Sequence, residues 1–106
     1  MKGYEVRKCR RIALSWSKER LADEANLDVR YIEFYEEGKN IPNWVADKID
    51  KTLWTGFNNL ESIEHFKKKI LEEALKISRE DNTQYLMQYI GHMLIEAGKL
   101  QMELMK

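Results

Sequence analysis

Apolar side chains recur three or four residues apart along most of this sequence, a spacing that places them on one face of a helix. Capping residues and glycines interrupt the pattern often enough to predict about six or seven helices, and no segment is a convincing strand. The chain has 106 residues, which suits one compact domain or a small domain with a helical appendage. We therefore expect an all-α fold, a small helical bundle followed by a C-terminal helical hairpin.

Composition narrows the classes of protein that this chain can belong to. Lysine plus arginine equals aspartate plus glutamate, 18 each, so overall charge indicates no particular partner, although DNA-binding domains are usually basic. The apolar runs are too short to span a bilayer and no leader opens the chain, so we expect no membrane partner and a cytoplasmic location. The single cysteine, Cys9, excludes an internal disulfide and is expected to be a buried structural thiol. A local basic cluster is either a solvated helix face or a surface for an acidic partner: Arg7, Lys8, Arg10 and Arg11.

Turn and cap residues divide residues 17–42 into two short helices and their connections. We expect Ser17 and Asp28 to be N-caps, Asn26 to adopt a positive φ, and Gly38 to end the second helix. The inward positions predicted for the N-terminal half are Val6, Cys9 and Ala13, then Leu21, Ala22 and Ala25, then Ile32 and Tyr35, and finally Val45, Ile49 and Leu53.

One connected pattern runs through this region: Ser17-Lys18-Glu19-Arg20-Leu21-Ala22, Asn26-Leu27-Asp28, Ile32, Glu36-Glu37-Gly38-Lys39 and Pro42. It resembles the helix-turn-helix of the phage-repressor-like family, also called the Xre type, and its spacing fits without a gap. The resemblance covers about residues 3–54, half of the chain, with lysine at position 18 where the family has glutamine. It implies a DNA-binding domain over residues 1–55, whose third helix enters the major groove of duplex DNA.

The resemblance also implies which side chains read bases. Val29, Arg30 and Phe34 would face the base edges, flanked by Asp28 and Glu33. Arg30 is the strongest candidate, because arginine can bind guanine O6 and N7 with two hydrogen bonds. Val29 or Phe34 could meet the methyl groups of thymine.

Other positions of the family pattern imply contacts to the DNA backbone and one structural pair. Lys18 with Arg11 nearby would contact phosphate at the start of the second helix, and Lys39 and Asn40 would do so in the loop after the third. Arg11 and Glu36 would also form an ion pair that joins the first and third helices, so that both are expected to have a structural role.

Residues 60–106 predict two longer helices, at about 60–78 and 83–105, after a boundary at Thr55–Asn59. The second helix carries an apolar seam with 4-3-4-3-4 spacing, typical of a coiled coil or an antiparallel hairpin: Leu86, Ile90, Met93, Ala97, Leu100 and Leu104. We expect this seam to pair two chains, the alternative being that the hairpin packs back on the N-terminal domain as extra core. Gly91 and Gly98 beside the seam indicate either a close approach of backbones or a fraying helix end.

Function follows from these patterns as two hypotheses. The first is a homodimeric, sequence-specific DNA-binding transcriptional regulator, a repressor that binds double-stranded DNA. The second is a protein-interaction factor, an antirepressor or antitoxin-like protein with a repurposed helix-turn-helix, motivated by an acidic third helix that holds four carboxylates against Arg30. We expect no enzyme, cofactor or small-molecule substrate, and no metal site, because His65 and His92 share no ligand spacing with Cys9. Lys67, Lys68 and Lys69 are expected to form a solvated face that could add attraction to DNA.

Overall fold

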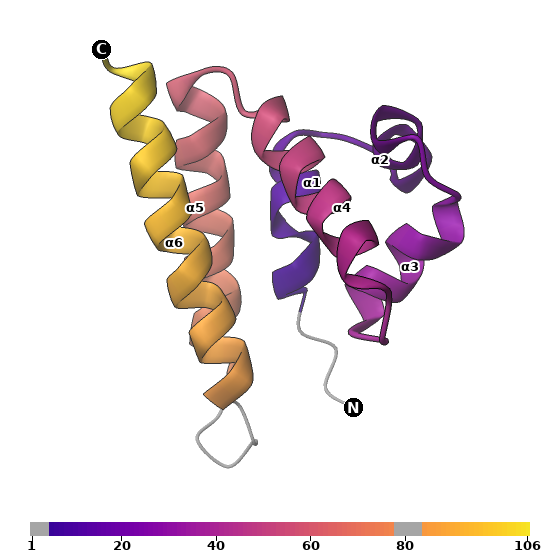
Figure 1. The fold of residues 1–106 in the computed structure, drawn as a ribbon. Coiled ribbons are helices and arrows are strands. Elements are labelled where there is room, and N and C mark those ends of the chain that lie inside the picture. The colour runs from indigo at the N-terminus through magenta and orange to yellow at the C-terminus, as the bar shows by residue number, and fades with distance from the viewer. Residues whose placement is uncertain (1–4, 78–83) are drawn as a thin grey trace.

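The computed structural model describes residues 5–77 and 84–106, and in these ranges helices are the only regular secondary structure (Figure 1). A short 3-10 helix, η1 (Val6–Lys8), leads into α1 (Cys9–Ala13), α2 (Lys18–Ala25), α3 (Val29–Glu37), α4 (Asn43–Gly56), α5 (Leu60–Leu75) and α6 (Gln84–Leu104). The antiparallel pair α5 and α6 lies on one side, α2 and α3 lie on the other, and α1 and α4 stand between them (Figure 1). The predicted all-α bundle with a C-terminal hairpin is confirmed. The predicted joining segment 79–82 lies outside the described residues.

Buried apolar side chains form two clusters, and almost every predicted inward position belongs to one of them. The first joins α2, α3 and α4 through Leu21, Ala22, Ile32, Val45, Ile49 and Leu53. The second joins η1, α1, α5 and α6 through Val6, Cys9, Phe57, Ile63, Phe66, Ile70, Ile90, Met93 and Ala97. The N-terminal segment therefore shares its core with the hairpin, and the predicted boundary at 55–59 does not separate two cores.

The apolar seam of α6 packs inside the chain. Ile90, Met93 and Ala97 are buried in the second cluster, and Leu86, Leu100 and Leu104 are half-buried against it. A neighbouring antiparallel helix satisfies heptad spacing as well as a second chain does, and here α5 is that neighbour. The seam is thus corrected from an interface between two chains to a contact within one chain. Dimerisation itself stays a prediction.

Arg10 lies between the two clusters, with its side chain only 1% exposed. Its Nη2 donates hydrogen bonds of 2.6 Å to the Asp50 Oδ1 of α4 and 2.6 Å to the Tyr35 hydroxyl of α3. The Tyr89 hydroxyl of α6 lies 3.0 Å from that of Tyr35, and the guanidinium stacks 4.9 Å from the ring centroid of Trp54. One buried cation therefore connects four helices.

The basic cluster of the N-terminal segment is used within the fold rather than presented to a partner. Arg7 stacks over the rings of Tyr85 and Tyr89 of α6, at 5.4 and 5.7 Å from their centroids. Lys8 pairs with Glu5 at 3.4 Å. Together with the buried Arg10, these contacts correct the idea of a solvated basic face.

Across the described ranges, none of the helices combines the length and the apolar character that crossing a membrane requires.

Candidate nucleic-acid interface

Two N-caps fix where α2 and α3 begin, as the sequence predicts. The Ser17 hydroxyl accepts a 3.0 Å hydrogen bond from the Arg20 N–H, and the Asp28 carboxylate accepts one of 2.9 Å from the Arg30 N–H. Each bond satisfies an amide that the first turn of a helix leaves without a partner. The start of α3, where the predicted base-reading residues lie, is therefore set by local chemistry.

Two residues in the left-handed region end these helices. Asn26 has φ 55° and terminates α2, and Gly38 has φ 76° and terminates α3. The reversal at Asn26 brings the Leu27 N–H to 2.9 Å from the Ala22 carbonyl oxygen, and Leu27 packs half-buried against the first cluster. The turn is thus held by a hydrogen bond and a buried side chain, which sets the direction of α3 relative to α2.

The predicted Arg11–Glu36 ion pair is present and buried. Arg11 Nε donates to Glu36 Oε2 at 2.7 Å and Nη2 donates to Oε1 at 3.0 Å, while Nη1 donates to the Trp16 carbonyl at 3.0 Å. The side chains are 13% and 2% exposed. This geometry fastens the C-terminal end of α3 to α1, and it commits Arg11 to the fold rather than to the predicted phosphate contact.

The predicted base-reading residues lie together on the outer side of α3. Arg30 is exposed, with 76% of its side chain accessible, and Phe34 is 37% exposed. Val29 and Glu33 are half-buried, and Val29 also touches the first cluster. A helix with Ile32 buried, Val29 at the edge of the core, and Arg30, Glu33 and Phe34 turned outward can present a patch of side chains to a groove.

The Arg30 guanidinium is held by its own neighbour. Its Nε lies 3.2 Å from Asp28 Oδ1 and its Nη2 lies 3.3 Å from Oδ2, a two-point pair on the surface. The hydrogen bonds from the Arg30 backbone and side chain lower the pKa of Asp28, and the same contact raises the pKa of Arg30. The carboxylate that caps α3 therefore occupies the hydrogen-bond donors that a guanine would need.

A second pair covers the other end of the patch. Lys39 Nζ lies 2.8 Å from Glu37 Oε2 and 5.4 Å from the ring centroid of Phe34. The hydrogen bond from Lys39 lowers the pKa of Glu37. Phe34 is thus partly covered by a cation.

The predicted phosphate contacts flank the patch at the start of α2 and in the loop after α3. Lys18 is half-buried in the first turn of α2, while Lys39 and Asn40 are exposed beyond α3. Sequence reasoning overlooked Arg20, which is exposed in the first turn of α2 and stacks 5.0 Å from the ring centroid of Trp16. Its place in a helix-start turn beside Lys18 was the available signal.

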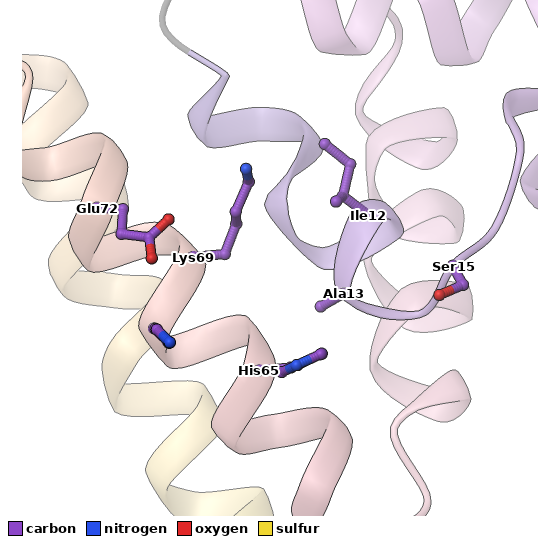
Figure 2. A pocket seen from close by; sticks show the side chains of 7 residues that line it. Ile12, Ala13, Ser15, His65, Lys69 and Glu72 are labelled. Carbon is purple, nitrogen blue, oxygen red and sulfur yellow. The ribbon is translucent and has the colours of Figure 1, made fainter.

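A hollow between α1 and α5 lies apart from this patch. It is lined by Ile12, Ala13, Ser15, His65, Lys68, Lys69 and Glu72, and Figure 2 shows His65 and Lys69 extending from α5 toward α1. Lys67 points elsewhere, because its Nζ donates to Gln101 of α6 at 3.1 Å. The lysine run on α5 therefore does not extend the surface of α3.

Groups of three or more histidine, cysteine, aspartate or glutamate side chains that could hold a metal ion do not occur in the described part of the chain. No protein-family model, no curated protein and no solved structure matches this chain. The function must therefore be argued from the site.

Proposed function

We propose that this chain is a sequence-specific DNA-binding transcriptional regulator, a repressor that places α3 in the major groove of duplex DNA. The observation that carries this proposal is the presentation of α3. Its inner face is buried, both of its ends are defined by Asp28 and Gly38, and Glu36 anchors it to α1. The outward patch on such a fixed helix has the form that groove recognition requires. The sequence resemblance described above adds to this argument.

In the proposed complex the flanking residues bind the DNA backbone and α3 reads bases. Lys18 and the free amides at the start of α2 contact phosphates on one side, and Lys39 and Asn40 contact them on the other. Arg30 leaves Asp28 to bind a guanine through two hydrogen bonds. A single short helix reads too few base pairs for useful specificity, so the proposal includes a homodimer that binds two half-sites. It also includes a cytoplasmic location and no cofactor.

The decisive experiment is the selection of bound duplexes from a random pool, with the wild-type chain and with Arg30→Ala in parallel. We expect a defined motif for the wild type, and loss of preference at one guanine position for the variant, by about 1–3 kcal/mol of discrimination. Enrichment without a motif, or a motif that Arg30→Ala leaves unchanged, would contradict the base-reading assignment.

Asp28 supplies a sharper test of the same contact. Serine at this position keeps an N-cap and removes the carboxylate that holds Arg30. We therefore expect Asp28→Ser to bind the selected duplex roughly threefold to tenfold more tightly at low salt. The matched control is Asp47→Ser, which removes the same charge from an exposed position on α4 and should change affinity much less. Equal effects of the two substitutions would show that only net charge matters.

One observation favours a second function, a protein-interaction factor of the antirepressor or antitoxin type. The accessible charges around α3 balance: the exposed Arg30 and Lys39 and the half-buried Lys18 stand against the exposed Asp28 and Glu37 and the half-buried Glu33. Asp28, Arg30, Tyr31 and Phe34 also line a small hollow that could receive a side chain of a protein partner. No duplex binding at low salt, together with a protein that co-purifies and is lost on Phe34→Ala, would favour this function over the first.

A further inference from the structure

Exposed large apolar side chains gather on the C-terminal hairpin. Of the ten such side chains in the described part of the chain, seven lie on α5 and α6 and an eighth, Met105, lies just after α6; the seven are Leu60, Leu71, Leu75, Tyr85, Met87, Ile95 and Met102. Leu75 is 88% exposed and Met102 is 69% exposed. A soluble chain that leaves this much apolar surface on one unit has a surface suited to a partner.

Four of these residues and four of their neighbours form an uncharged stripe along α6, beside the buried seam, with Leu94 at the border half-buried against the second cluster. We call it the outer stripe, and its members are Gln84, Met87, Gly91, Leu94, Ile95, Gly98, Met102 and Met105. At 100° per residue these positions occupy about 100° of the helix circumference. The charged and histidine side chains of α6 fall outside it, at His92, Glu96, Lys99 and Glu103. The outer stripe is therefore a continuous face without charge.

The two glycines of the outer stripe have no function in the packing of their own chain. A Cβ built on Gly91 or Gly98 would meet none of the described atoms within 4 Å. Glycine weakens a helix relative to alanine, so both positions lower the stability of α6 and leave its backbone uncovered by a side chain. Bare backbone lets another helix approach closely.

The outer stripe has the same spacing when it is read from either end. About a midpoint between Leu94 and Ile95, the steps are 3, 4 and 3 residues in both directions. In an antiparallel pair of α6 helices, Gly91 would therefore face Gly98 of a second copy. The remaining pairs follow from the same symmetry: Met87 with Met102, Gln84 with Met105, and Leu94 with Ile95. A two-fold contact between identical chains requires this self-complementarity, whereas a different partner imposes no such symmetry.

We propose that the chain forms a two-fold symmetric homodimer in which the outer stripes of two α6 helices pack antiparallel. The proposed function already includes a homodimer, and this inference names the surface that forms it. The contact forms without DNA, so it can be tested separately from DNA binding. It also replaces the buried seam as the place where two chains meet.

The adjoining surface of α5 makes the contact large enough. Gln101 hydrogen-bonds to Glu64 at 2.6 Å and to Lys67 at 3.1 Å, which fixes the antiparallel register of the hairpin. Leu71 and Leu75 are one and two turns further along α5, next to the middle of the outer stripe in this register. A face about 30 Å long and two helices wide covers about 600 Å² per chain, or about 1,200 Å² per dimer. That area is at the lower end of stable protein interfaces.

Sedimentation equilibrium of the full chain without DNA tests the face. We expect a dimer at micromolar concentration for the wild type and a monomer for Ile95→Lys, which buries a charge at the centre of the outer stripe. The control His92→Lys also places a lysine at an exposed position on α6, but outside the stripe, and should stay dimeric. Circular dichroism of both variants shows whether they are folded. A monomeric wild type, or a folded Ile95→Lys dimer, would overturn the proposal.

Disulfide trapping tests the antiparallel register. Gly91→Cys and Gly98→Cys chains, mixed and oxidised, should cross-link to each other far more than either does to itself. In the proposed pairing the two positions face each other, whereas identical positions are about 10 Å apart along the helix axis, beyond the reach of a disulfide. The native Cys9 is fully buried and does not compete. Preferential self-linking of each variant would refute the antiparallel arrangement.

Discussion

Asp28 has two roles that oppose each other at the level of a single residue. Its carboxylate caps α3 and so helps to place the patch, yet the same carboxylate holds the Arg30 guanidinium at 3.2 Å. Sequence reasoning predicted the cap, because capping depends on residues two or three apart. It did not predict the side-chain pair, because an exposed arginine can turn either to solvent or to a nearby carboxylate. The proposed recognition of a base by Arg30 therefore requires the loss of a local contact.

Cys9 gives a prediction about pH. Burial, and to a smaller extent the nearby carboxylate of Glu73, raise the pKa of its thiol to about 12. The thiol also lies 3.3 Å from the Glu5 carbonyl oxygen, as a donor. The folded chain thus keeps this proton between about pH 9 and about pH 12, where the unfolded chain loses it. The free energy of unfolding should therefore fall with rising pH in that window.

The measurement is urea unfolding at several pH values from neutral to alkaline, for the wild type and for Cys9→Ala. The wild-type slope should be steeper by up to about 1.4 kcal/mol per pH unit, the contribution of one proton. Burial also raises the pKa of Tyr35, so some alkaline loss should remain in the variant. Parallel slopes for the two proteins would contradict the prediction.

At the scale of helices, local signals predicted where elements begin and end, but not which neighbour each would contact. The seam of α6 specifies an apolar face, and either α5 or a second chain would satisfy it equally well. Arg10 shows the same division. From the sequence it belonged to a basic cluster, either a solvated face or a surface for an acidic partner, and its partners Tyr35, Asp50 and Tyr89 lie 25 to 79 residues away. Only the tertiary fold brings such groups together.

The Arg11–Glu36 pair leads to a prediction about how α3 is fixed. Glu36→Leu should destabilise the chain by about 3–5 kcal/mol, because it leaves the Arg11 charge unpaired in a site that is 13% exposed. The double variant Arg11→Met with Glu36→Leu should recover most of this loss, since no buried charge remains. Urea unfolding of the two single variants and the double variant measures the coupling.

The exposed Glu37 provides the matched control on the same helix. Glu37→Leu also removes a carboxylate from an ion pair, but Lys39 is 61% exposed and water can solvate it. We expect no comparable loss of stability. If Glu36→Leu were as mild as Glu37→Leu, the buried pair would not be what holds α3 against α1.

At the scale of the whole molecule, the proposed DNA binding requires a chain with no net charge to bind a polyanion through few cations. Of the basic side chains in the N-terminal segment, Arg10 and Arg11 are held inside the fold, and Arg7 is stacked on α6. The lysines of α5 lie apart from α3. Two lysines remain near the patch, and the sequence assigns both of them to phosphate contacts: Lys18 and Lys39. This small number sets how strongly salt should weaken DNA binding.

The affinity for DNA should therefore fall only gradually with rising salt concentration, and the slope should show whether one chain or two chains are bound. Two phosphate contacts per chain predict that log K falls with log salt at a slope of about −2 for one chain, and about −4 for a dimer. Lys39→Ala should reduce the dimer slope by about 2, because both chains lose one contact. The slope is obtained by titrating the selected duplex at several salt concentrations.

The monomeric variant Ile95→Lys connects this measurement to the proposed dimer. It changes a residue of α6 that lies outside the patch on α3, so each chain should keep its own phosphate contacts and show the slope of a single chain. A slope near −4 in this variant would mean that one chain supplies all the contacts and that further cations, such as Arg20, bind phosphate. A slope near zero in the wild type would remove the electrostatic basis of DNA binding. The balanced charges around α3 would then favour a protein partner, because such a surface gains little from phosphate and loses little to salt.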